Sequence, residues 1–206
     1  MNQTELRKLP RDERDRLRRV QIVEAAMNCV ITHGFHRATT AMIAREAGFS
    51  EGQLYRYFES KEAIMGALVE TMTERQLKRI IAAKDSRDLA DIIIREMTDD
   101  SEDIRKERII YLEMLAEATR NPSVAMILSK ADAQRKAKAV KSLRAEFADL
   151  SDEEVYGVAE YIATLNEGRT IRAAQSDSKT TEAFLSIYRK AFSFLLPDEQ
   201  VSERKQ

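Results

Sequence analysis

The sequence contains few residues that interrupt or cross-link helices. Its 206 residues include six glycines, three prolines, one cysteine and no tryptophan. Because glycine and proline end most helices, their scarcity beside many Ala, Leu, Glu, Arg and Lys residues favours an all-α fold. The single cysteine, Cys29, excludes an internal disulfide. It shares an apolar helix face with Ile22 and Ala26, which indicates a buried small side chain rather than a redox sensor.

Other absences restrict location and chemistry. No apolar run reaches 18 residues and the charged N-terminus lacks an apolar signal segment, so we expect a cytoplasmic protein without a membrane span. The two histidines, His33 and His36, have no glutamate three residues before them, which argues against a di-metal helical enzyme. Phosphate-binding glycine loops and nucleophile elbows are also missing. We therefore expect no catalytic residues, metal site or cofactor.

The most specific pattern lies in residues 39–58 and begins with a short predicted helix. Thr39 and Thr40 are N-cap residue types placed before an apolar segment. Ile43 and Ala47 are four residues apart and should face inward on one side of that helix. Gly48 can adopt the positive φ needed where this helix stops and the next begins.

A second short helix is predicted to begin after Ser50. Ser50 and Gln53 have the spacing of a capping box, which satisfies two backbone donors at a helix start. Leu54 and Phe58 face the core, whereas Gln53, Arg56 and Tyr57 remain on the outer side. A helix–turn–helix requires this division, because one face holds the motif together and the other enters the major groove.

The first seventy or so residues resemble the DNA-binding domain of the TetR family of transcriptional repressors. The resemblance extends over many positions of this segment. The matching residues are Ile22, Ala25, Ala26, Gly34, Phe35, Thr39, Thr40, Ile43, Ala44, Ala47, Gly48, Ser50, Gly52, Leu54, Tyr55, Tyr57, Phe58, Ser60, Lys61 and Glu62. The remaining two-thirds of the chain matches that family only in general character.

The resemblance implies a set of DNA contacts. Tyr55, Tyr57 and Lys61 would contact phosphates, which fix register without reading sequence. Gln53 and Arg56 would recognise bases. The full expected set is Thr39, Thr40, Ser50, Glu51, Gly52, Gln53, Tyr55, Arg56, Tyr57 and Lys61. The role of Tyr55 stays open, because its ring could serve mainly as a packed aromatic side chain. Arg56 stands where the family often has an aromatic residue, and it would make either a base contact or a further phosphate contact.

Charge is distributed unevenly along the sequence. The formal net charge is −1, yet residues 7–19 contain seven Lys or Arg against three acids. This segment forms either a basic arm that reaches DNA phosphates or a solvated, charged helix start. The acidic surplus must then lie in later residues, which would limit DNA attraction to the N-terminal part.

Helical periodicity and capping signals divide the whole chain into about nine helices. Besides the helix–turn–helix, we expect helices near 12–32, 60–83, 86–98, 102–119, 122–148, 151–175 and 179–196. Pro122 suits a first helical position, and Ser151 with Glu154 forms another capping box. The expected domains are a basic arm over 1–15, a three-helix DNA-binding domain over 16–76, and a helical ligand-binding and dimerisation domain over 77–206.

The last two predicted helices are candidates for a dimer interface. The final helix is apolar over more than half its circumference, so it should pack against two surfaces. In the TetR family, these two helices pair with their copies in a four-helix bundle, and a homodimer would supply two DNA half-sites. Candidate interface residues are Val158, Ile162, Phe184, Ile187, Tyr188 and Ala191. The alternative is that this stripe belongs entirely to the intramolecular core.

The middle helices would enclose an effector pocket if the resemblance extends to the family mechanism. Arg108 interrupts an apolar face and would pair with an anionic ligand or a carboxylate, or else reach solvent. Candidate pocket residues are Met65, Met97, Arg108, Tyr111, Met114, Leu115 and Tyr161. The methionines and Tyr161 serve equally well as ordinary core.

Together these features predict a homodimeric repressor that binds a palindromic operator and is released by a small-molecule inducer. Effector binding would change the spacing of the DNA-binding segments through the helix near 60–83, so DNA and effector would oppose each other. An activator or a DNA-bound structural protein of the same fold is the alternative. The sequence specifies neither the effector nor the operator.

Overall fold

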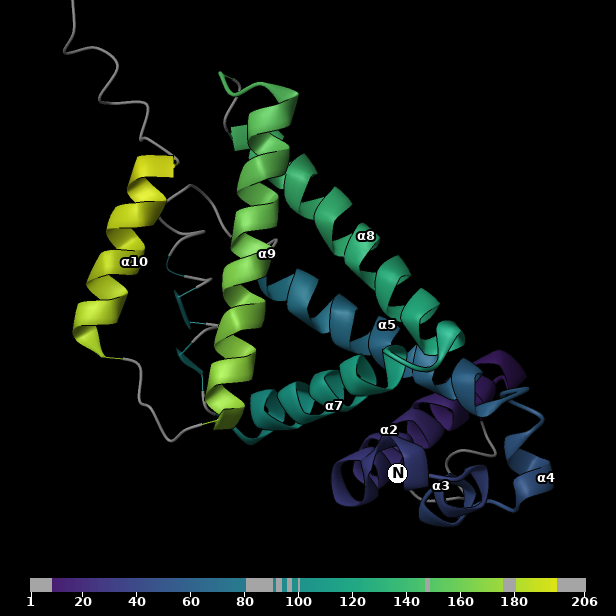
Figure 1. The fold of residues 1–206 in the computed structure, drawn as a ribbon. Coiled ribbons are helices and arrows are strands. Elements are labelled where there is room, and N and C mark those ends of the chain that lie inside the picture. Colours follow the sequence, from purple (N-terminus) through teal and green to yellow (C-terminus); the bar gives the residue numbers. More distant parts are fainter. Residues whose placement is uncertain are drawn as a thin grey trace, which may run out of the picture. The chain divides into compact units, whose positions relative to one another are not determined.

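The structure is a computed structural model that describes residues 9–80, 91, 94–95, 98–99, 101–146, 149–175 and 181–195. These residues contain eight helices and no strand, which confirms the predicted all-α class (Figure 1). The helices are α2 (Arg11–Arg37), α3 (Thr40–Glu46), α4 (Glu51–Leu54), α5 (Lys61–Ile80), α7 (Glu102–Ala118), α8 (Pro122–Glu146), α9 (Asp152–Gln175) and α10 (Glu182–Leu195). The helix expected over 86–98 falls largely outside the described residues.

Two compact units make up the chain. Unit 1 comprises Met1–Met72 and Arg105–Ala131, and unit 2 comprises Thr73–Ile104 and Asp132–Gln206. Unit 1 thus combines the N-terminal helices with most of α7 and the first part of α8. The functional division between residues 76 and 77 remains a prediction.

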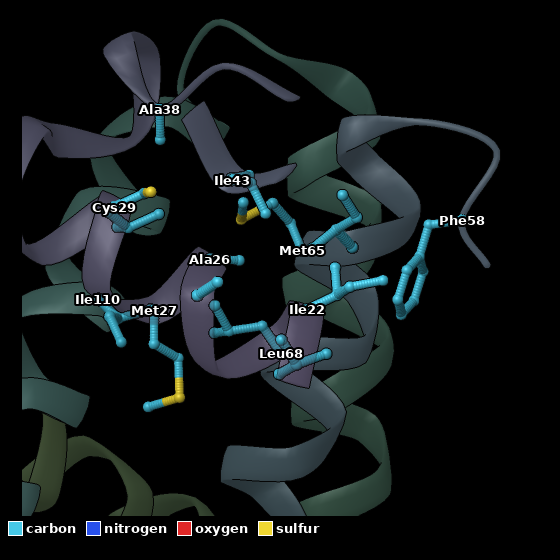
Figure 2. Packing of buried hydrophobic residues seen from close by; sticks show 14 of the residues in the cluster. Ile22, Ala26, Met27, Cys29, Ala38, Ile43, Phe58, Met65, Leu68 and Ile110 are labelled. Carbon is cyan, nitrogen blue, oxygen red and sulfur yellow. The ribbon is translucent and has the colours of Figure 1, made fainter. Parts of the chain in front are cut away.

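The core of unit 1 forms around the apolar face of α2. Ile22, Ala26 and Val30 recur every four residues on that helix, and all three are fully buried. Figure 2 shows Ile43, Met65 and other buried side chains of the same core. Cys29 is buried among them, as expected, and burial raises the pKa of its thiol.

A break at Gly34 separates the last turn of α2 from the rest of the helix. The sequence predicted a helix end near this glycine, and the structure has a kink there, after which a further helical segment extends to Arg37. Gly34 has φ 78° and ψ 160°, which few residues with a side chain adopt. Beyond it, the Ala38 N–H donates to the Gly34 carbonyl at 3.2 Å, and Thr39 caps the start of α3.

The turn between α3 and α4 has the geometry that the sequence predicted. Gly48 has φ 72°, its N–H donates to the Arg45 carbonyl, and the Phe49 N–H donates to the Ala44 carbonyl. These two bonds form a Schellman motif, which satisfies the last carbonyls of α3. Ser50 and Gln53 then form the expected capping box at the start of α4.

Unit 2 has a smaller core in which α8, α9 and α10 take part. Val155, Val158 and Tyr188 are buried there with Leu143 of α8. Polar contacts also join α8 to the start of α9: Arg144 pairs with Asp152 and donates to the Leu150 carbonyl. The predicted capping box of Ser151 and Glu154 is present. No helix within the described ranges is long and apolar enough to cross a bilayer.

The two glycines Gly48 and Gly66 provide a matched test of the turn. A Cβ at either position meets no atom within 4 Å, but only Gly48 has a positive φ. We expect Gly48→Ala to lower the free energy of unfolding by about 1–2 kcal/mol because of backbone strain. In contrast, Gly66→Ala, inside α5, should raise it by about 0.4–1 kcal/mol. Urea unfolding followed by circular dichroism measures both, and equal effects would contradict the assigned backbone geometry.

Candidate nucleic-acid interface

The helix–turn–helix presents a polar outer face because most of its large apolar side chains are turned inward. Ile43 and Ala44 of α3, Leu54 of α4 and Phe58 are buried. Exposed side chains on the segment include Thr39, Ser50, Glu51, Gln53, Tyr55 and Arg56, with Gly52 also exposed, whereas Thr40, Tyr57 and Lys61 are half-buried. The structure therefore brings nearly all of the predicted DNA-contact residues to one accessible segment, with the half-buried three at its margin.

The start of α3 and the end of α4 meet on this face. The Thr40 Oγ1 and the Tyr55 hydroxyl oxygen are 3.4 Å apart, so these two groups can share a hydrogen bond. Tyr55 is 49% exposed, which argues against a mainly packed role for its ring. Tyr57 is more enclosed, because its ring lies 6.0 Å from the Phe49 ring. Both tyrosines nevertheless belong to the same accessible segment.

Three of the predicted contact residues also hold the backbone. The Thr39 hydroxyl accepts from the Met42 N–H at 3.2 Å, and the Ser50 hydroxyl accepts from the Gln53 N–H at 3.3 Å. The Gln53 Oε1 accepts from the Ser50 N–H at 2.9 Å. An amide that recognises adenine uses both its oxygen and its NH₂ group. Gln53 must therefore give up its cap or contact a base through the NH₂ group alone.

Arg56 is an exposed cation on the outer face. Among the residues that the structure describes, none makes a hydrogen bond or ion pair with its guanidinium. Its five N–H donors are therefore available to an external acceptor such as a guanine edge or a phosphate. The geometry is compatible with both roles that the sequence left open for this side chain.

Arg18 and Arg19 of α2 serve a structural role that sequence reasoning did not identify. The Arg18 guanidinium lies 5.2 Å from the centre of the Phe49 ring, and that of Arg19 lies 4.1 Å from the Phe58 ring. Arg19 also donates to the Tyr57 carbonyl. These arginines belong to the segment predicted to form a basic arm or a solvated helix start. They contact residues that flank α4, and only the tertiary fold brings them to those aromatic rings.

Lys61, at the start of α5, is also engaged within unit 1. Its Nζ donates to the Phe35 carbonyl at 2.5 Å and to the His36 carbonyl at 3.4 Å. Desolvation lowers the pKa of Lys61, and the nearby carboxylates of Glu117 and Glu62 oppose that shift. An ammonium has three N–H donors, so these bonds leave one for a phosphate. The sequence indicated the phosphate contact but not the contacts with the end of α2.

The predicted effector-pocket residues are distributed over both units. Met65 and Met114 are fully buried in the core of unit 1. Arg108, Tyr111 and Leu115 lie in the same unit, whereas Tyr161 lies in unit 2. Met97 is outside the described residues. The two methionines thus have the core role that the sequence left open, and the pocket itself stays a prediction.

The predicted dimer residues separate into buried and exposed groups within unit 2. Val158 and Tyr188 are buried in its core, and Ile162 packs against that core. In contrast, Ile187 is 67% exposed and Phe184 is 41% exposed. Ala191 is half-buried. An outward apolar group therefore remains on α10 after the core of unit 2 has formed.

In the described part of the chain, no group of three His, Cys, Asp or Glu side chains is arranged to hold a metal ion.

Replacing Arg19 tests its bracing role. We expect Arg19→Ala to lower the free energy of unfolding by about 1 kcal/mol, because the substitution removes the ring contact and the hydrogen bond to Tyr57. Arg16→Ala is the control, since Arg16 is an exposed arginine on the same helix and should change stability by less than about 0.5 kcal/mol. Urea unfolding gives both values. Equal values for the two variants would show that the brace adds nothing to stability.

Comparison with known proteins connects this geometry to a family. A model for bacterial regulatory proteins of the tetR family matches residues 22–68. UidR, an HTH-type transcriptional regulator of Escherichia coli (strain K12), is 31% identical over 110 residues, which are 53% of this chain and 56% of UidR. SlmA, a nucleoid occlusion factor of Vibrio campbellii, is 33% identical over 113 residues, which are 54% of this chain and 51% of SlmA. The chain thus matches these curated relatives over about half their length.

Solved structures share the fold over most of the chain. GusR of Salmonella enterica aligns with a TM-score of 0.73 at 24% identity, covering 87% of this chain and 95% of GusR. A Rhodococcus protein described as a TetR-family transcriptional regulator aligns with a TM-score of 0.74 at 19% identity, covering 86% and 97%. By their names, UidR is a transcriptional regulator and SlmA is a nucleoid occlusion factor, and neither name is that of an enzyme. Residues 22–68 thus match the tetR family of bacterial regulatory proteins, and the solved structures show that the chain shares their fold.

Proposed function

We propose that this protein is a DNA-binding transcriptional regulator that contacts duplex DNA through α3 and α4. One observation carries the proposal: Ile43, Leu54 and Phe58 of this helix–turn–helix are buried, while the predicted contact residues line an accessible polar segment. The second helix of such a motif enters the major groove, where side chains reach base edges. The relative UidR, by its name a transcriptional regulator, supports the same function. The proposal places the protein in the cytoplasm, where bacterial DNA lies.

Within this interface, the contacts divide into two classes. Arg56 and the Gln53 NH₂ group are assigned to base edges, with Thr40, Glu51 and Gly52 beside them. Tyr55, Tyr57 and the remaining N–H of Lys61 are assigned to phosphates, which set orientation and add salt-dependent affinity. Thr39 and Ser50 contribute through their caps, which fix the starts of α3 and α4.

The same proposal includes a homodimer on a near-palindromic operator. A single helix–turn–helix covers only a half-site, and two-fold symmetry provides the second one. The exposed apolar side chains Phe184 and Ile187 support α10 as part of the dimer contact. Val158, Ile162 and Tyr188 would then support the interface from inside unit 2, with Ala191 at its edge.

Regulation by a small molecule completes the proposed mechanism. The protein would repress transcription when free of effector, and an effector bound among the predicted pocket residues would release it from DNA. By linkage, DNA and effector must then weaken each other's binding by the same factor. The similarity to the nucleoid occlusion factor SlmA favours one alternative, a DNA-bound protein that does not act on a promoter. A reporter gene placed behind the bound DNA site distinguishes the two functions.

A binding experiment tests the proposed interface. A duplex is first selected from a random pool with the full chain, and its affinity is compared with that of a scrambled duplex by fluorescence anisotropy across a salt series. We expect Arg56→Ala to weaken binding to the selected duplex by about 1–3 kcal/mol and to relax base preference at one position. Arg45→Ala is the matched control. Arg45 is an exposed arginine of α3 that is not among the predicted DNA contacts, and it lies close enough to Cys29 of α2 to affect that thiol electrostatically.

Two outcomes would contradict this proposal. Equal, salt-sensitive binding to the selected and scrambled duplexes would mean that the chain attracts DNA only through its charge. Equal losses for Arg56→Ala and Arg45→Ala would mean that Arg56 contacts no base. Tyr55→Phe adds a further control, since it removes the hydroxyl but keeps the ring, and should reduce affinity for both duplexes alike.

The dimer contact is tested by placing a charge on α10. We expect Ile187→Glu to convert a dimer into a monomer, because a carboxylate buried in an apolar interface would lack a partner. Met126→Glu is the control, since Met126 is similarly exposed at 68% but lies on α8 in unit 1. Analytical ultracentrifugation measures the mass of each variant. A dimeric Ile187→Glu protein would exclude this part of α10 from the interface.

A further inference from the structure

The break in α2 leaves a peptide group that needs partners from elsewhere. In an uninterrupted helix, the Phe35 N–H would donate to the carbonyl four residues earlier. The conformation of Gly34 prevents this, and the Phe35 N–H instead donates to the Glu113 Oε2 at 2.8 Å. Glu113 belongs to α7 and lies 78 positions after Phe35 in the sequence. A distant carboxylate therefore satisfies a donor in the DNA-binding segment.

The other side of the same residue is held by Lys61. Its Nζ donates to the Phe35 carbonyl at 2.5 Å and lies 4.3 Å from the centre of the Phe35 ring. The Phe35 side chain is itself buried. Phe35 is thus fixed through its N–H, its carbonyl and its ring. We call this arrangement of Glu113, Phe35 and Lys61 the Phe35 clamp.

The position of α7 within unit 1 is well defined around the clamp. Ile110 and Met114, on either side of Glu113 along α7, are fully buried in the core of unit 1. One turn later, Glu117 is also buried, pairs with Arg120 and is close enough to Lys61 to affect its electrostatics. The Glu113 carboxylate therefore extends from an anchored helix toward the break. It leaves little space, because a Cβ on Gly34 would lie 3.0 Å from its Oε2.

The Phe35 clamp lies immediately before the helix–turn–helix. Thr39, the N-cap of α3, follows Phe35 by four residues, and Ala38 between them is buried and bonded to the Gly34 carbonyl. The direction in which the chain leaves α2 therefore sets where α3 begins, and with it the placement of α4. A change in this direction would misplace the outer face without unfolding either helix.

We propose that Glu113 is a positioning residue for DNA binding: by holding the Phe35 N–H opposite Lys61, it fixes the break in α2 and hence the placement of α3 and α4. This inference rests on the DNA-binding function proposed above. Glu113 touches no DNA in this scheme and acts through the backbone. Its contribution is to sequence-selective binding, because base contacts require accurate placement, whereas charge-driven binding does not.

Two conservative substitutions distinguish the effect of the length of the Glu113 side chain from the effect of its charge. Glu113→Gln retains the length of the side chain and an oxygen acceptor but loses the charge. Glu113→Asp retains the charge but is one methylene shorter, so its carboxylate falls short of the Phe35 N–H. We expect Glu113→Asp to speed amide hydrogen exchange at Phe35 and to weaken binding to the selected duplex, each by about tenfold. Binding to the scrambled duplex should change by less than about twofold.

Amide exchange by NMR and anisotropy on the full chain measure these effects, with circular dichroism confirming that each variant is folded. Glu113→Gln should remain within about threefold of wild type in both assays. The inference is overturned if Glu113→Asp behaves like wild type in either assay, or if Glu113→Gln loses as much as Glu113→Asp. If the wild type does not discriminate between the duplexes, the proposed function fails. The exchange assay then still decides whether Glu113 holds the Phe35 N–H.

Discussion

Burial of the apolar face of α2 is the constraint on which the DNA-binding segment depends. Helices α3 and α4 have seven and four residues, which is too short for stable helices in water. They persist because Ile43 and Leu54 are buried in the core that Ile22 of α2 helps to form. The outer face is consequently held in place only because the inner face is packed. A substitution that removes apolar side chains from this core would therefore also disturb the candidate DNA contacts.

Around that core, the chain changes direction at two glycines with positive φ, and each turn is stabilised differently. The turn at Gly48 is satisfied locally by the carbonyls of α3 and by the capping box of α4. The break at Gly34 is satisfied by side chains distant in sequence, Glu113 and Lys61. The first turn therefore forms from its own residues, whereas the second requires α5 and α7 to be in place.

Basic residues near the helix–turn–helix make contacts within the protein and also contribute to its positive electrostatic field. Arg18, Arg19 and Lys61 contact aromatic rings, and the last two also donate to backbone carbonyls. Their charges still contribute to the long-range field that attracts DNA. Because these three side chains are held by contacts within unit 1, we assign base recognition to the exposed groups of α4 and its flanks, chiefly Arg56.

The sequence by itself determined the local structure: the Thr39 and Ser50 caps, the turn at Gly48, and the alternation that buries Leu54 and exposes Arg56. These features depend on neighbours within about five residues, whose chemistry a sequence displays directly. Only the tertiary structure decided that Arg19 braces Phe58, that Glu113 holds Phe35, and that Met114 lies in the core of unit 1. Those contacts join residues far apart in the sequence, and their partners are set by how the helices pack rather than by any local pattern.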